Sequence, residues 1–549
     1  MGLVTRLWVA AAALALAGCV ATQPPAVVTG GKPRLVVVFV IDGLPQRQVV
    51  DYRDQLSPDG FERFFTRGAW FTEAHYRYAV TETAPGHATI ATGAYPHRSG
   101  IVANGWRDPA TGESAYCYAD PGATYIGHRT RPNEGTSPRN LLAEGVGDVL
   151  KRIDARSKVI AISDKDRGAI GPAAKRGTAY VFREEDGDFA STTYYMKEHP
   201  KWVAEFNASR PAHRYLGAEW RPLLPEAAYA RSLPDERKWF APNGKLPRKL
   251  PEAANKDFYE AVMDSPFGDD LLLAFARAAI AGEQLGTDGS PDILFIGLST
   301  HDYINHGYGA ESRLSHDHVL YLDRELADFF NDLDVSVGRE NYVAVLTADH
   351  GFTPVPEHSQ SLGREAGRID PGKMLARVNA AMVKKFGAGR WVSGFSAGGL
   401  VLNRTLARIR NVALAEVANE ARNLVAAEPG ISKAYTRAEI EGPAGPADAL
   451  LEAVRNSWYP PRSPDLFFVL KPYWLLGSHT MGTSHGSPHP YDTNVPLMLY
   501  GPAWIPPVGR IDKPVEVSDI APTISKLLGI PAPAQSEGKP LAFEPLVPR

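Results

Sequence analysis

Three short apolar runs, each followed within a few residues by an aspartate, constrain the fold of this 549-residue chain most strongly. The runs and their aspartates are 36–41 with Asp42, 292–298 with Asp302, and 342–347 with Asp349. Because apolar residues follow one another here without alternating with polar ones, each run is typical of a strand buried on both faces of a parallel sheet.

Helical stretches lie between these runs, for example from Asp269 to Ala281 and from His316 to Leu333. This alternation predicts an α/β fold with a largely parallel central sheet, helices on both faces and inserted cap elements. Such sheets place their sites beyond the carboxyl ends of the strands. We therefore expect the three aspartates to converge there.

Histidines near these aspartates indicate a metal site. His306 stands four residues after Asp302, His350 directly follows Asp349, and His485 lies in GTSHG. A strand-end aspartate alone is more often a cap or turn residue than a ligand. Three carboxylates and three imidazoles without a thiolate, however, suit exchangeable zinc sites, although manganese or iron could bind them too. Six ligands suffice for two ions about 3.5–4 Å apart, an arrangement used in phosphoryl transfer.

The stretch TETAPGHATIATG, residues 81–93, predicts a short helix. Pro85 falls in its first turn and Gly93 just past its last, so Thr83 stands at or beside the N-cap. A threonine before a proline is commonly a plain cap. Beside two metal ions at a helix N-terminus, which attracts anions, its hydroxyl can instead serve as a nucleophile toward phosphorus.

The order of these motifs resembles the alkaline phosphatase superfamily. The motifs are Asp42, Thr83-x-Pro-Gly-His, Asp302-x-x-x-His306, Asp349-His350 and Thr483-Ser-His485-Gly, and the likeness runs from Leu35 to the closing SDIAPTISKLLGI. The chain is most similar to the threonine-nucleophile branch. That branch holds the PafA-like and SPAP-type bacterial alkaline phosphatases and the nucleotide pyrophosphatase/phosphodiesterases.

This resemblance implies a role for each residue. One zinc ion would be held by Asp302, His306 and His485, and the other by Asp42, Asp349 and His350. Thr83 would be the nucleophile, bridging toward the second ion and forming a phosphothreonine. His489 is the one serious rival to His485 as a ligand.

Three further residues are implied to hold the phosphoryl oxygens. Asn104, in IVANGW, resembles an asparagine that both sub-branches use. Lys165 and Arg167, in SDKDR, resemble the Lys-x-Arg pair of the PafA-like monoesterases. In extended backbone the two cations would point the same way. A Lys-Asp-Arg triplet alone is typical of a solvated turn. The planar guanidinium of arginine and the compact ammonium of lysine together, however, suit a phosphate dianion.

The chain is thus expected to be a zinc-dependent alkaline phosphatase that releases inorganic phosphate from monoesters, with activity rising at alkaline pH. Two alternatives stay open. One is a phosphodiesterase or nucleotide pyrophosphatase with the same metal site, in which Lys165 and Arg167 are only surface charges. The other is a lipoprotein that binds phosphate or metal without catalysis. The sequence does not name the leaving group.

The N-terminus is expected to direct export. Residues 1–19 carry one early cation and an apolar run, as in a signal peptide, and Leu16-Ala17-Gly18-Cys19 resembles the bacterial lipobox. Lipidation of Cys19 would anchor the protein on the periplasmic side, with Val20 favouring the outer membrane; cleavage near Ala21 is the alternative. The net charge of -3 gives no reason to expect a nucleic-acid partner. With Cys117 as the other cysteine, a disulfide framework is excluded.

The expected domain layout follows from these motifs. A tether at 20–33 leads into a catalytic domain at 34–535, and a tail follows at 536–549. Accessory insertions are expected at about 180–265 and 356–467, where they would frame the mouth of the pocket. Oligomeric state is not predicted.

Overall fold

The computed structural model describes residues 31–109, 111–131, 134–443, 447–477 and 480–543. The expected signal peptide, Cys19, most of the tether and the end of the tail lie outside the described residues. Within the described ranges, none of the helices combines the length and the apolar character needed to cross a bilayer. The predicted division into domains stays a prediction.

In the described part of the chain, a nine-stranded sheet forms the centre of the molecule. Its middle is made by the three apolar runs, as β1 (Leu35–Ile41), β11 (Asp292–Leu298) and β12 (Tyr342–Thr347). Strand β1 pairs in parallel with both neighbours, Ile41 opposite Leu298 and Val40 opposite Thr347, so the three carboxyl ends lie nearly level. The predicted α/β fold is confirmed.

The remaining strands extend the sheet on both sides. Beyond β11, strands β6 and β7 continue in parallel and β8 runs antiparallel, whereas beyond β12 strand β19 runs antiparallel. The bounds of these outer strands are β6 (Val159–Ser163), β7 (Thr178–Arg183), β8 (Asp188–Ala190), β19 (Leu497–Tyr500), β2 (Ala69–Phe71) and β20 (Gly509–Ile511).

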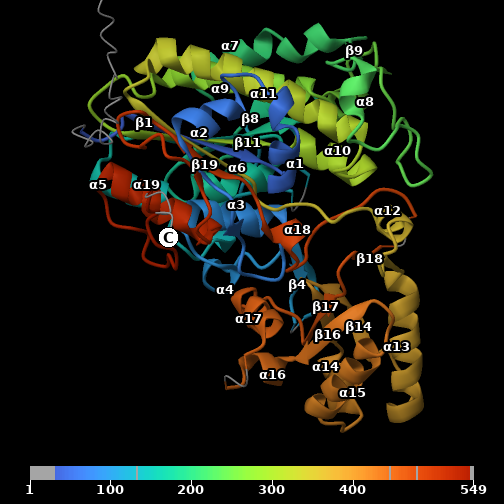
Figure 1. Cartoon of the computed structure of the whole chain (residues 1–549). Coiled ribbons are helices and arrows are strands. Elements are labelled where there is room, and N and C mark those ends of the chain that lie inside the picture. The colour runs from blue at the N-terminus through green and yellow to red at the C-terminus, as the bar shows by residue number, and fades with distance from the viewer. Residues whose placement is uncertain (1–30, 110, 132–133, 444–446, 478–479, 544–549) are drawn as a thin grey trace, which may run out of the picture.

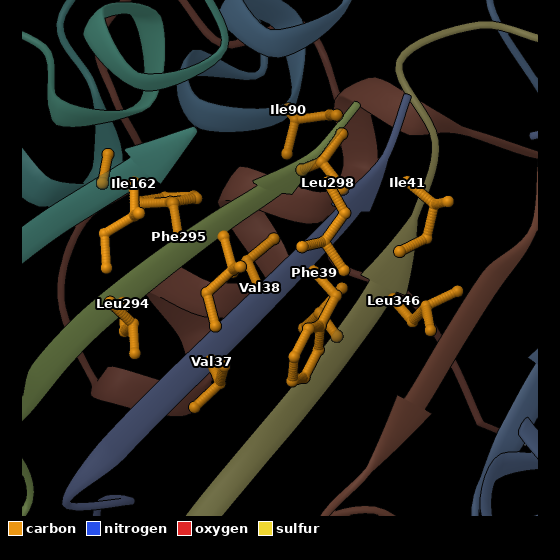
Figure 2. Close-up of a cluster of buried hydrophobic side chains, with 14 of the residues drawn as sticks. Val37, Val38, Phe39, Ile41, Ile90, Ile162, Leu294, Phe295, Leu298 and Leu346 are labelled. Atoms are coloured by element: carbon orange, nitrogen blue, oxygen red, sulfur yellow. The ribbon is translucent and has the colours of Figure 1, made fainter. Parts of the chain in front are cut away.

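Helices cover both faces of the sheet (Figure 1). On one face lie α9 (Phe267–Glu283) and α11 (Arg313–Leu333), and on the other α3 (Thr83–Thr92), α6 (Asp166–Ala173) and α19 (Ile520–Leu528). Figure 2 shows side chains of β1 and β11 packing among those of their neighbours, with Ile90 of α3 beside Leu298. Burial of each such side chain stabilises the fold by about 1.5–3 kcal/mol, so the strand ends stand on a rigid platform.

A smaller sheet lies beside the main one, in the lower half of Figure 1. Its order is β14 (Val392–Ser396), β15 (Gly399–Leu402), β17 (Leu466–Leu470) and β16 (Ile431–Thr436), all antiparallel. Helices α13 (Pro371–Phe386) and α15 (Leu414–Ala426) cover it, and a separate core around Trp391 holds it together.

The sequence pattern predicts a helical stretch over residues 406–426, and the structure divides it. The structure has two helices there, α14 (Arg404–Ile409) and α15 (Leu414–Ala426). Asn411 between them has a φ of 54°. Asparagine tolerates this left-handed conformation better than most residues, and a single residue in it ends a right-handed helix.

Candidate active site

The carboxyl ends of the three central strands bring six predicted ligands together. Asp42 directly follows β1, and Asp349 and His350 follow β12. Helix α10 (Thr300–Tyr308), which begins just after β11, carries Asp302 in its first turn and His306 one turn later on the same face. His485 arrives from the loop between β18 (Trp474–Leu476) and α18 (Pro490–Thr493).

These residues form two groups that could each hold a metal ion. Potential ligand atoms of Asp302, His306 and His485 lie within 4.8 Å of one another, and so do those of Asp42, Asp349 and His350. The rings of His350 and His485 stack with centroids 3.5 Å apart, so the two groups adjoin. The grouping matches the expected one for two ions.

The three histidines are oriented as metal ligands require. Each Nδ1 lies at hydrogen-bond distance from a backbone carbonyl: His306 from Thr483 at 3.0 Å, His485 from Thr81 at 2.8 Å, and His350 from Gly351 at 2.9 Å. An Nδ1–H that donates to a carbonyl leaves the lone pair of Nε2 free to bind a metal.

Several buried atoms in the site have no hydrogen-bond partner among the described residues. They are Asp42 Oδ1, Asp302 Oδ1, Asp349 Oδ2 and His350 Nε2. A buried polar atom without a hydrogen bond costs about 1–3 kcal/mol, and ion pairs such as that of His350 Nε2 with Asp42 Oδ1, 3.3 Å apart, offset part of this cost. Because all four belong to the two ligand groups, divalent cations fit this donor set.

Lys165 places its ammonium between the two groups. Its Nζ lies 2.8 Å from Asp42 Oδ2 and also contacts the Asp302 carboxylate. Burial raises the pKa of Asp42, but the Lys165 ammonium and His350 lower it more, so this pKa lies well below its ordinary value. Burial opposes the charge of Lys165, yet the Asp302 and Asp42 carboxylates raise its pKa. The site therefore attracts positive charge.

The pKa values of His350 and Asp349 are also shifted by the buried carboxylates around them. Burial lowers the pKa of His350, but Asp349 and Asp42 raise it more, to about 10. Burial, followed by the nearby Asp42, raises the pKa of Asp349 itself. Three buried carboxylates at one point are costly unless cations neutralise them.

Helix α3 begins at Thr83, as the Pro85 and Gly93 signals predict, with Glu82 as its N-cap. Gly86 sets its position, because a Cβ there would lie 2.3 Å from the backbone oxygen of Asp349. His87 Nδ1 lies 3.0 Å from the backbone carbonyl oxygen of Thr83 and 3.3 Å from Asp349 Oδ2. The Pro-Gly-His motif thus fixes the nucleophile candidate against the ligand group of Asp42, Asp349 and His350.

Asn104 lies against the start of the same helix. Its Oδ1 accepts a hydrogen bond from Ala84 N at 2.8 Å, and its backbone N–H donates to Glu82 Oε2 at 2.7 Å. With Oδ1 engaged, the two N–H groups of its amide are what Asn104 can offer to an anion.

The expected extended backbone around Lys165 and Arg167 is wrong. Strand β6 ends at Ser163, Lys165 is the N-cap of α6, and Arg167 lies in the first turn of that helix. Arg167 is half-buried; burial opposes its charge, but Tyr116 and Asp166 raise its pKa. Lys165 contacts both ligand groups directly, whereas the nearest charge partners of Arg167 are Tyr116 and Asp166.

Glu82 and Asp492 also belong to the site, although the sequence motifs did not point to them. Glu82 is the residue directly before Thr83, and burial raises its pKa. Asp492 accepts from Ser487 N at 2.9 Å and from Thr353 Oγ1 at 3.1 Å, so it ties the loop after His350 to the loop after His485. Burial raises the pKa of Asp492 to about 7.

The rival ligand His489 lies outside both groups. Its Nε2 is 2.9 Å from the oxygen of Leu470. A third group of possible ligands, His128, Asp186 and Asp188, is present elsewhere. There Arg210 Nη1 lies 2.9 Å from Asp188 Oδ1 and neutralises part of the charge.

Comparison with known proteins agrees with this geometry. The family model for type I phosphodiesterase/nucleotide pyrophosphatase matches residues 36–492. Alkaline phosphatase PafA of Elizabethkingia meningoseptica is 34% identical over 93% of this chain and 94% of its own length. Alkaline phosphatase PhoV of Synechococcus elongatus is 33% identical over 93% of this chain and 92% of its own length.

The fold is also similar to that of a solved alkaline phosphatase structure. The crystal structure of PafA, at 32% identity, has a TM-score of 0.86 and covers 93% of this chain and 99% of that chain. A PafA mutant in which a threonine, an asparagine, a lysine and an arginine are replaced also has a TM-score of 0.86, at 31% identity.

Proposed function

The chain belongs to the type I phosphodiesterase/nucleotide pyrophosphatase family, and we propose that within it the protein is a zinc-dependent alkaline phosphatase that releases inorganic phosphate from phosphate monoesters. One observation carries this proposal: two ligand groups adjoin at the strand ends, with the Lys165 ammonium between them and the Thr83 helix against one of them. The solved PafA mutant replaces a threonine, an asparagine, a lysine and an arginine, and this chain has the same residue types in the same order in Thr83, Asn104, Lys165 and Arg167.

In the first step, the Thr83 oxygen forms a bond to phosphorus while the bond from phosphorus to the leaving oxygen breaks. The leaving alcohol departs with a proton, and Thr83 is left as a phosphothreonine. Water then attacks the same phosphorus, which releases inorganic phosphate and returns the hydroxyl. When bound, two zinc ions would supply the positive charge that lowers the pKa of a hydroxyl and offsets charge on the phosphoryl oxygens.

The chain's own residues hold the phosphoryl group. At the start of α3, Ala84 N donates to Asn104 Oδ1 and Pro85 has no N–H, so the helix N-terminus offers an anion the backbone N–H of Thr83. The Asn104 amide adds further donors beside it. Lys165 and Arg167 would bind the second negative charge of a phosphate monoester dianion. A phosphate diester carries only one negative charge. This difference separates the proposed monoesterase from the diesterase alternative.

Replacing Lys165 or Arg167 by alanine is expected to lower kcat/KM for 4-nitrophenyl phosphate about 10- to 100-fold, as loss of a charge-assisted hydrogen bond does. The value for bis-4-nitrophenyl phosphate should fall less, because that substrate carries one negative charge. Steady-state kinetics with both substrates tests this.

The matched control is Arg156→Ala, whose side chain is 77% exposed and pairs with Asp154 at the surface. Its selectivity should equal that of the unmodified protein. Equal losses for monoester and diester in the Lys165 and Arg167 variants would show that these cations do not select the dianion.

We also propose that the protein is exported and anchored on the periplasmic side of the outer membrane through a lipid on Cys19. The signal-like residues 1–19 and the lipobox Leu16-Ala17-Gly18-Cys19 support this. A Cys19→Ser protein should move from the membrane fraction to the soluble fraction of cells. Unchanged membrane association would mean that Cys19 is not the anchor.

A further inference from the structure

A cavity of about 440 Å³ lies between the smaller sheet and the candidate active site. Its walls include the turn between β14 and β15, the end of β17, strand β18 and the loop that carries His485. Figure 1 shows β14 and β17 close to β4 (Gly105–Arg107), the strand that follows Asn104. The volume is within the range of small-molecule sites.

The turn between β14 and β15, which forms part of the cavity wall, is held in place by close packing and a hydrogen bond. Ala397 and Gly398 form the turn with φ values of 40° and 78°, as a two-residue hairpin of the primed type requires. A Cβ on Gly398 would lie 2.5 Å from the ring of Phe467, so the turn packs directly on β17. Arg107 N donates to Ser396 Oγ at 2.9 Å, which ties the hairpin to the strand after Asn104.

The cavity borders the active site at His485 and at Glu82, the residue directly before Thr83. Its lining includes His485, which belongs to the ligand group of Asp302 and His306. Thr83 is held against the other group, through Gly86 and Asp349. Since the leaving oxygen departs roughly in line with and opposite the nucleophile, it would leave toward His485.

Apolar side chains and polar groups both line the cavity, and large apolar side chains come from the smaller sheet and strand β18. These are Phe395, Phe467, Leu470, Trp474 and Leu476. Among the described lining residues, the charged or titratable side chains are Glu82 and His485, and no lysine or arginine is present. A leaving group that carries further phosphates would lose hydration here without a counter-charge.

We propose that this cavity binds the organic part of the leaving group and favours monoesters of uncharged aromatic or bulky alkyl alcohols over those of small or anionic alcohols. The inference rests on the proposed phosphatase function. It gives the smaller sheet a role in substrate selection, which the ligand groups alone cannot provide.

The test compares 2-phenylethyl phosphate with ethyl phosphate, two alkyl esters whose leaving groups differ mainly in the ring. The unmodified protein should have a kcat/KM about 10- to 100-fold higher for the phenylethyl ester, the effect of burying an aromatic ring. Phe395→Ala and Leu476→Ala should each lower the value for the phenylethyl ester more than the value for ethyl phosphate, and so reduce that ratio several-fold. Ile409→Ala, at a 72% exposed position outside the lining, is the matched control and should leave the ratio unchanged.

A binding measurement is independent of turnover. The Thr83→Ala protein should bind 2-phenylethylphosphonate at least ten-fold more tightly than ethylphosphonate by calorimetry, and Phe395→Ala on that background should remove the difference. A ratio near one for both esters, unaltered in the two cavity variants, or equal affinities for the two phosphonates, would overturn the cavity proposal. Failure to hydrolyse even ethyl phosphate and 4-nitrophenyl phosphate would instead overturn the proposed function.

Discussion

Replacing Thr83 by alanine is expected to lower kcat/KM for 4-nitrophenyl phosphate by about 10³-fold or more, the scale seen when a covalent nucleophile is removed. The methyl side chain of alanine cannot form the phosphorylated intermediate. Helix α3 should persist, because its N-cap is Glu82 and its position is set by Gly86 against Asp349. Steady-state kinetics on metal-loaded protein measures the loss.

The conservative variant Thr83→Ser keeps a hydroxyl at the same place and should retain far more activity than Thr83→Ala. The bound metal content of all three proteins should be similar, since the carboxylate and imidazole ligands of both groups are unchanged. Near-normal turnover by Thr83→Ala would mean that water attacks the substrate directly or that another residue is the nucleophile.

Replacing Asp302 by alanine is expected to remove one of two bound metal ions and to lower activity by about 10²- to 10³-fold, as loss of transition-state charge stabilisation does. Asp302 is the only carboxylate in the group it forms with His306 and His485. Two neutral imidazoles remain, which is one ligand fewer than catalytic zinc sites use. Atomic emission on desalted protein measures the metal content.

The control for this experiment is Asp186→Ala, in the third group of possible ligands. In that group Arg210 already pairs with Asp188, so the loss of the Asp186 carboxylate should leave both the metal content and the activity unchanged. The metal account is contradicted if the Asp302→Ala protein keeps both ions, or if chelation of the unmodified protein leaves its activity intact.

The framework of the site could be predicted from sequence because it depends on local patterns. Strands β1, β11 and β12 could be predicted because buried parallel strands consist of uninterrupted apolar residues. Their carboxyl ends lie at the same edge of the sheet, where such folds place their sites. The start of α3 was visible because Pro85 and Gly93 mark the two ends of a helix chemically. The likeness to known motifs then ordered the six ligands into two groups.

Other features depend on contacts between distant segments, which no local pattern reports. The backbone at Lys165 turns into a helix directly after β6, and a charged triplet does not show this. Asp492 gains its role from Thr353, 139 residues away in sequence. The cavity wall made by Phe395 and Phe467 brings together β14 and β17, and the hydrogen bond from Arg107 N to Ser396 Oγ is a further long-range contact of β14.

The most direct test of the central claim is the ratio of kcat/KM for 4-nitrophenyl phosphate to that for bis-4-nitrophenyl phosphate, measured on zinc-loaded protein. A ratio well above one is predicted, because Lys165 and Arg167 add positive charge where a monoester dianion would bind. A ratio below one would contradict the proposal and make the protein a phosphodiesterase with the same metal ligands.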